Sequence, residues 1–252
     1  MGLELEEEES LQYYKRSEMK MRITSDVISC VLLFLFVFPF AAIAGVGSTK
    51  HNLSVSGTGD ARAITETEVC KFCHTPHNAS PGAPLWNHQL SSVDTYTSYW
   101  SPTLKSYASP EDAPPIDGFS KLCLSCHDGT VALGALINHG ELVETIPDML
   151  SFGMVGYLGT DLSGGHPISI VFDQALVTRR NSEPDLLHLN WPITDKDVKL
   201  YVTQGGRGVQ CTSCHDPHGG KGETGAPPFW QKKTYDDVCI VCHNISVPGI
   251  GH

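Results

Sequence analysis

The sequence predicts a mostly irregular fold with short helices, in which the chain wraps four cysteine-rich motifs and forms little other regular structure. Three observations support this prediction. Eight of the nine cysteines lie in CxxCH motifs, 24 glycines and 16 prolines interrupt the chain, and apolar residues alternate along DVKLYVT before a Gly-rich turn. Glycine and proline at this frequency favour loops, and the alternation predicts a small β-hairpin over residues 198–209. TVALGALI, residues 130–137, is expected to form a short helix.

Residues 1–44 are expected to form an N-terminal extension and signal peptide outside the mature fold. A basic stretch ending at Arg22 precedes an apolar run over residues 27–40, and small residues then lead to Gly45. This order is typical of a secretory signal peptide. The run is short for a membrane span, which needs about 20 residues, although an uncleaved anchor stays open. The acidic opening MGLELEEEES does not suit a signal peptide, so translation of residues 1–18 stays open too.

The mature chain is acidic. Removal of the leader takes Lys plus Arg from 17 to 13 and Asp plus Glu from 28 to 21, which leaves a net charge of −8. Nucleic acid is excluded as a partner, because its phosphates require a basic surface. The balance suits an exported soluble protein that meets other proteins through weakly charged patches. We therefore predict a periplasmic or extracellular location.

Every cysteine of the mature chain belongs to a CxxCH motif. Two thiols three residues apart lie on one side of a helical turn, where both can add to the vinyl groups of one haem. The imidazole that follows can bind the iron. We therefore predict four covalent haems c, one for each motif. The attachment residues are Cys70 and Cys73 in the first motif, Cys123 and Cys126 in the second, Cys211 and Cys214 in the third, and Cys239 and Cys242 in the fourth; the iron-binding residues are His74, His127, His215 and His243.

CxxC pairs also occur in zinc sites and in redox-active disulfides. Zinc sites combine two such pairs, or one pair with two distant histidines, and redox-active disulfides need the pair alone. Neither explains a histidine after every pair. Four haems on 208 residues also leave too little chain for a separate large core, so the porphyrin faces are expected to take its place in a multihaem cytochrome wrap.

Histidines are expected to fill the second axial position of each iron. The mature chain has only two methionines, Met149 and Met154, but eight histidines beyond those of the motifs. Haems without methionine ligation have low potentials, and a doubly ligated iron has no open position for a substrate. Electron transfer is therefore expected, and no enzymatic activity.

An internal repeat selects the candidate distal ligands. Each half reads HxxS, then CxxCHxPH, then a proline–tryptophan segment, then CxxCH, which predicts dihaem halves at residues 45–150 and 151–252. In CHxPH the proline turns the chain, so the second histidine should reach a neighbouring haem, with a solvent-facing histidine as the alternative. Trp86 and Trp230 are expected to pack on haem faces. The distal candidates are His51, His77, His166 and His218, while His88, His139, His188 and His252 have no counterpart in the repeat.

At this point the chain resembles a known family. The runs KHNLS, CKFCHTPHNASPGAPLWNH, CLSCHDGT, GHPISI, CTSCHDPHGG and CIVCHN, within residues 50–245, resemble exported multihaem cytochromes c with a doubled CxxCH motif. The resemblance implies bis-histidine haems and electron exchange with redox partner proteins outside the cytoplasmic membrane, and leaves a membrane-associated electron donor open. Some similar tetrahaem and hexahaem cytochromes stack into extracellular filaments, so homo-oligomers or a filament subunit form the alternative. A multihaem reductase is the third hypothesis, although no feature of the sequence indicates an iron with an open coordination position.

Overall fold

The computed structural model describes residues 16, 45–80, 83, 85–138, 146, 149–191, 194–221 and 229–244. The chain divides into two compact units, Met1–Ile43 and Ala44–His252, and the fold described below belongs to the second. Among the described residues, no helix has the length and apolar character needed to span a membrane. The predicted leader lies almost wholly outside the described residues, as do His139 and His252. The predicted division into two dihaem halves stays a prediction.

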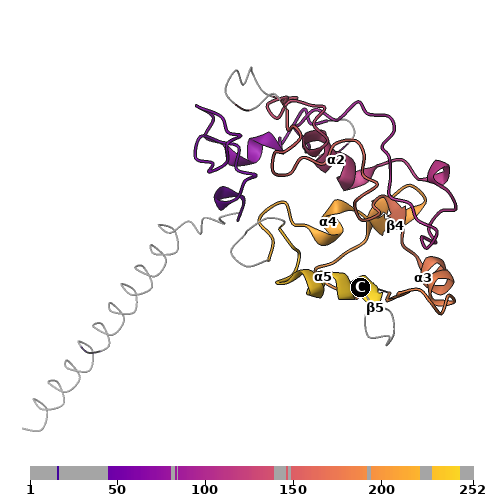
Figure 1. Cartoon of the computed structure of the whole chain (residues 1–252). Helices are drawn as coiled ribbons and strands as arrows, with labels where there is room; N and C mark the ends of the chain where they lie inside the picture. The colour runs from indigo at the N-terminus through magenta and orange to yellow at the C-terminus, as the bar shows by residue number, and fades with distance from the viewer. Residues whose placement is uncertain are drawn as a thin grey trace, which may run out of the picture. The chain divides into compact units, whose positions relative to one another are not determined.

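Short helices and very short strands alternate along the second unit (Figure 1). The longest helix, α2, has ten residues. The helices are η1 Gly45–Ser48, η2 Val69–Phe72, η3 Pro110–Asp112, α2 Gly118–His127, α3 Gln174–Asn181, α4 Cys211–Cys214 and α5 Tyr235–Cys242; the strands are β1 Ile170–Val171, β2 His188–Leu189, β3 Tyr201–Thr203, β4 Gly206–Val209 and β5 His243–Asn244.

Local sequence explains why the helices form at the CxxCH motifs. The Thr234 side chain caps α5 by accepting a hydrogen bond from the backbone N–H of Asp237 at 3.1 Å, and acidic residues occupy the first turn. Both features stabilise a helix N-terminus. At α4, Gln210 and Ser213 form a reciprocal capping box. The third and fourth motifs therefore lie on short, capped helical turns.

The larger sheet has three strands in the order β1-β4-β3, all antiparallel. β3 and β4 form a hairpin where the sequence predicts one, and Gly205 in its turn has a φ of +90°. Gly208 has no room for a side chain, because a Cβ there would lie 1.9 Å from the Ile170 carbonyl oxygen. In the smaller sheet, β2 pairs with β5, so that His188 faces Asn244 and Leu189 faces His243.

The helix predicted over residues 130–137 is wrong, since the structure has turns and a bridge there. The backbone of this segment pairs with the chain after the first motif. Gln89 N–H donates to the Ala135 carbonyl at 2.8 Å, and Ile137 N–H donates to the Asn87 carbonyl at 2.7 Å. Gly134 also lowers the helix propensity of the segment. These cross-chain hydrogen bonds replace those of a helix.

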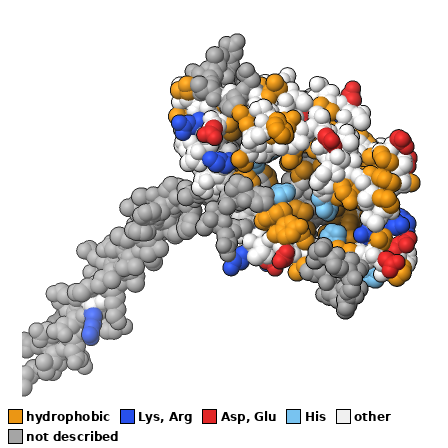
Figure 2. All heavy atoms as spheres, viewed as in Figure 1, with side chains coloured by type: hydrophobic (Ala, Val, Ile, Leu, Met, Phe, Trp, Pro, Cys, Tyr) orange, Lys and Arg blue, Asp and Glu red, His pale blue; other side chains and the backbone are white. Residues whose placement is uncertain are grey.

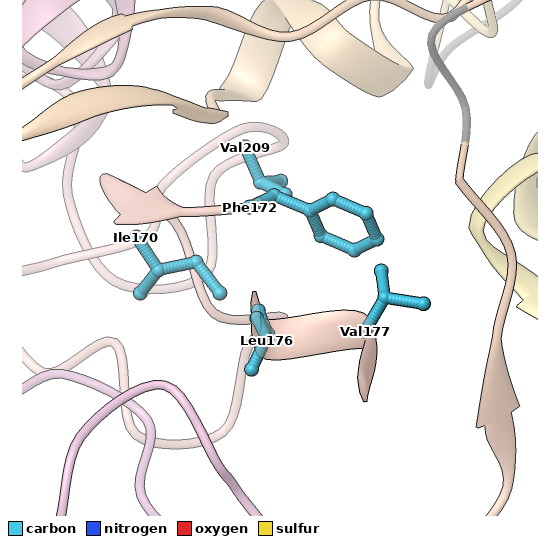
Figure 3. Close-up of a cluster of buried hydrophobic side chains, with 5 residues drawn as sticks. All are labelled: Ile170, Phe172, Leu176, Val177 and Val209. Atoms are coloured by element: carbon cyan, nitrogen blue, oxygen red, sulfur yellow. The ribbon is translucent and has the colours of Figure 1, made fainter. Parts of the chain in front are cut away.

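A buried apolar cluster lies between the three-stranded sheet and α3 (Figure 3). Ile170 and Val209 extend from the sheet, Phe172 follows β1, and Leu176 and Val177 come from the helix. The Trp191 ring stacks on Phe172 with centroids 5.9 Å apart. This cluster supports the third and fourth motifs, because Val209 lies two residues before Cys211 and the half-buried Cys242 packs against the cluster.

A buried polar network joins α2 to the hairpin. The Gln210 side chain accepts a hydrogen bond from Ser120 N–H at 2.8 Å and donates to Asp117 Oδ1 at 2.9 Å. The Ser120 hydroxyl in turn accepts a hydrogen bond from Cys211 N–H at 3.1 Å, and both Ser120 and Gln210 are completely buried. Buried polar groups that are satisfied by one another fix a single arrangement. The network therefore fixes the second motif against the third.

We predict that Phe172→Ala lowers the free energy of unfolding by about 3–5 kcal/mol, because a large buried side chain leaves a cavity beside Trp191. The measurement is chemical denaturation of the haem-loaded protein, followed by tryptophan fluorescence. The matched control is Val202→Ala, whose side chain is 72% exposed, and which should change stability by less than about 0.5 kcal/mol. Equal effects of the two substitutions would contradict the assignment of this core.

Candidate haem-binding site

All eight cysteines of the described residues are free thiols. Burial raises the pKa of Cys73 and of Cys214 to about 11, and that of Cys126 and of Cys242 to about 12. Within the described ranges, no group of three or more His, Cys, Asp or Glu side chains is placed to hold a metal ion directly.

The cysteines also show which motifs are neighbours. Cys123 and Cys211 form a thiol–thiol hydrogen bond, which lowers the pKa of Cys211 to about 7 and raises that of Cys123. Cys73 lies close enough to Cys126 to raise its pKa electrostatically, in addition to the larger effect of burial. Cys214 has the same secondary effect on Cys242. The four motifs therefore follow one another in space in the order first, second, third, fourth.

Three pairs of histidine rings lie at a centroid separation that would suit two rings bound to one metal ion. The ring centroids lie 5.9 Å apart for His51 and His127, 6.1 Å for His74 and His218, and 6.1 Å for His166 and His243. An imidazole nitrogen binds a metal at about 2.0–2.1 Å, so two rings on opposite sides of one ion have centroids about 6 Å apart. Each pair joins the histidine of one CxxCH motif to one of the distal candidates.

Backbone carbonyls orient several of these rings. The Nδ1 atom of His127 lies 2.6 Å from the Gly156 oxygen, that of His51 lies 2.9 Å from the Pro217 oxygen, and that of His166 lies 2.9 Å from the Pro167 oxygen. A carbonyl only accepts, so each Nδ1 carries the proton and each Nε2 keeps its lone pair. This is the arrangement of a histidine that ligates iron through Nε2.

Burial favours the neutral imidazole at His243 and at His51. It lowers the pKa of His243 to about 4, with smaller contributions from His166 and Arg180. It also lowers the pKa of His51, to which the facing His127 adds while the hydrogen bond to Pro217 opposes it. A neutral imidazole is the form that binds a metal. These sites therefore suit an axial ligand at physiological pH.

The surroundings of the histidines suit an apolar cofactor. Figure 2 shows histidine side chains and hydrophobic side chains gathered around a hollow in one face. Beside the Gly156 carbonyl that holds His127, Phe152 is 94% exposed and Val155 is 83% exposed. Exposed apolar side chains near this histidine could pack against an apolar cofactor such as a porphyrin. The donor set and its surroundings therefore fit haem.

The internal repeat recurs in the backbone. Thr75 N–H donates to the Leu85 carbonyl at 2.9 Å, and Asp216 N–H donates to the Phe229 carbonyl at 2.8 Å. Leu85 and Phe229 both have a φ of +61°, which is rare for residues other than glycine. The next residue in each half forms a β-bridge with the motif histidine; the two bridges are His74 with Trp86 and His215 with Trp230.

The two tryptophans contact the motif histidines. Trp230 stacks on His215 with ring centroids 4.7 Å apart, and Trp86 meets His74 edge-on at 6.1 Å. Each indole therefore helps to fix the orientation of an iron-binding imidazole. Their packing on haem faces stays a prediction.

The other histidines have different surroundings. His88 is almost completely buried, and both its ring nitrogens face backbone carbonyls, of Gln89 at 2.8 Å and of Ala132 at 3.0 Å. With the proton on Nδ1, the Nε2 atom keeps its lone pair and also lies 3.6 Å from Cys126 Sγ. His88 therefore joins residues 87–89 to the second motif and to the segment after it. The His188 Nε2 atom is buried and has no hydrogen-bond partner among the described residues. His77 is exposed, with Asn138 Nδ2 at 3.4 Å from its Nδ1 atom.

Sequence reasoning missed the groups that orient the ligands. They include the carbonyls of Gly156 and Pro217 and the buried network of Gln210 and Asp117. A backbone carbonyl has no residue-type signature, so no sequence pattern could have identified the first two. The buried network pairs residues far apart in the chain and becomes visible only in the fold.

Comparison with known proteins supports the same chemistry. The sequence model of a family described as the doubled CXXCH motif matches residues 204–246, which contain the third and fourth motifs. No curated protein matches the chain. With two CxxCH motifs in the matched region, the chain is a c-type-cytochrome-like, haem-binding protein that carries covalently attached haem c.

We predict that replacing Cys239 and Cys242 together by serine lowers the mass of the purified protein by one haem, because a hydroxyl does not replace the thiol in thioether formation. Intact-mass spectrometry under denaturing conditions measures this directly. The matched control, Ile240→Ala, changes a residue between the two cysteines and should keep every haem. A double variant with an unchanged haem count would contradict attachment at this motif.

Proposed function

We propose that the protein is an electron carrier with four covalent haems c, each bis-histidine ligated and of low potential, working outside the cytoplasmic membrane. The observation that carries the proposal is the set of three facing histidine pairs, each with one CxxCH histidine at a distance that fits one iron. A haem iron with two histidines cycles between ferric and ferrous states and so carries one electron.

The pairs follow a rule set by the internal repeat. The HxxS histidine serves the second motif of its own half, as His51 does for His127 and His166 for His243. The CHxPH histidine serves the first motif of the other half, as His218 does for His74. By the same rule we propose that His77 is the distal ligand of the third motif.

The chain's own residues supply position and protonation state. Carbonyls hold the proton on Nδ1 of His51, His127 and His166, so Nε2 is available to iron. Cysteines of successive motifs lie near one another, which supports haem sites close enough for electron transfer. Partner proteins would exchange electrons at the surface of the acidic molecule, and a membrane-associated donor is proposed as one of them.

The filament alternative is not favoured by these contacts. A filament often draws an axial histidine from the next subunit, but the three facing pairs form within one chain. A substrate-reducing enzyme would need an iron with an open position. Two histidines facing each other at each of three sites leave no such position there, so we propose a carrier.

We predict four haems for each mature chain. The intact mass of the exported protein should equal the polypeptide from Gly45 plus four haems, because all eight mature cysteines lie in CxxCH motifs. Mass spectrometry of protein isolated from an expression host that matures c-type cytochromes checks both the leader and the count. Fewer haems would contradict the count, and a mass that retains residues 1–44 would contradict cleavage.

We predict that His51→Ala, His166→Ala and His218→Ala each convert one low-spin haem to a high-spin or water-bound haem without loss of haem. The reason is that each removes one axial ligand and leaves the thioethers and the CxxCH histidine in place. Electron paramagnetic resonance of the oxidised protein reports the spin states. The control is His88→Ala, which should keep four low-spin haems because His88 belongs to none of the three histidine pairs and is not in the proposed ligand set. A low-spin count unchanged by any of the three substitutions would contradict that ligand assignment.

A further inference from the structure

We propose that the carbonyl of Pro217 is a positioning group for His51, so that the segment CHDPH, residues 214–218, acts on three haem sites. This inference rests on the proposed function and deepens it. His215 is the motif ligand of the segment's own haem, and His218 faces His74 of the first motif at 6.1 Å. Between them, the Pro217 oxygen lies 2.9 Å from His51 Nδ1, and the His51 ring faces His127 of the second motif at 5.9 Å.

The segment is rigid enough for this task. Proline fixes its own φ near −65° and so narrows the directions open to the backbone at residue 217. On one side, Asp216 N–H donates to the Phe229 carbonyl at 2.8 Å. On the other side, His218 N–H donates to the Asp216 side chain at 2.9 Å, and Gly219 N–H donates to the Asp216 carbonyl at 3.1 Å. The Pro217 carbonyl is therefore held from both sides.

The chain around His51 closely contacts this segment. The Phe229 ring lies 4.9 Å from the His51 ring, which places an apolar wall behind the imidazole. A Cβ at Gly45 would lie 2.8 Å from the His218 carbonyl oxygen, so only glycine permits this approach of the N-terminal segment. Asn52 is buried and donates to the Gly47 carbonyl at 2.9 Å, which fixes the backbone next to His51.

The two halves of the repeat differ at this point. His166, the counterpart of His51, has its Nδ1 atom 2.9 Å from the carbonyl of its own neighbour, Pro167. His51 is followed by Asn52 instead, and its carbonyl partner comes from the other half of the chain. The second-motif haem therefore depends on the CHDPH segment, whereas the fourth-motif haem does not depend on the CHTPH segment, residues 73–77.

The hydrogen bond has two effects on the ligand. It fixes the tautomer and the orientation of the ring, here at 63° to the plane of His127. It also makes the imidazole more basic, which favours the ferric state and lowers the potential of that haem. A loose or misdirected carbonyl should therefore change the electron paramagnetic resonance signal of the second-motif haem and raise its potential.

The test compares Pro217→Gly with the matched repeat variant Pro76→Gly in the full haem-loaded chain. His51→Ala first identifies the signal of the second-motif haem, and His166→Ala identifies that of the fourth. Pro217→Gly should shift the signal of the second-motif haem and move its potential upward, and should disturb the first-motif haem through His218. Pro76→Gly should leave the second- and fourth-motif signals as they are, with any change confined to the third.

A second measurement keeps the proposal testable if Pro217→Gly does not assemble. In the fully reduced wild-type protein, labelled with ¹⁵N-histidine, the Nδ1 proton of His51 should exchange slowly with solvent. A fast-exchanging proton, or a Pro217→Gly variant with unchanged second-motif signal and potential, would overturn the positioning role. If His51→Ala itself keeps four low-spin haems, the ligand assignment in the proposed function fails instead, so the two failures are distinguishable.

Discussion

The facing of His74 and His218 is the contact on which the rest of the arrangement depends. It brings the first motif next to the CHDPH segment, residues 214–218, at a ring separation that suits one iron. Regular structure offers few other long-range links among the described residues, where the longest helix has ten residues and the strands have two to four. Under the proposed ligation, an iron bound by His74 and His218 would supply the long-range link that a large core provides in other folds.

Three further contacts join the same parts of the chain. Gln210 and Ser120 bring the start of α2 against α4, and the Cys123 and Cys211 thiols hydrogen-bond there. The His51 ring also takes its carbonyl partner from Pro217. A polar network, neighbouring haem attachment points and a ligand-orienting carbonyl therefore act on one interface, and a change at that interface should alter several haems together.

Local residue spacing made much of the site predictable. The remaining features depend on contacts between distant parts of the chain, which the sequence does not indicate. The CxxCH motif predicts covalent haem attachment within five residues, and the repeat identifies His51, His166 and His218 as candidate distal ligands. Nothing local says that His218 faces His74, since that pairing is a property of the fold. The 130–137 segment failed as a helix for the same reason, because its backbone hydrogen bonds go to residues 87 and 89.

The most direct test of this account is an experimental structure of the haem-loaded protein, with the axial ligands of the first-motif iron as the quantity to determine. The account predicts that His74 and His218 bind opposite sides of that iron, and that each CHxPH segment reaches across to the other half. A first-motif iron with any ligand other than His218 opposite His74, or a His218 ring in solvent, would contradict it.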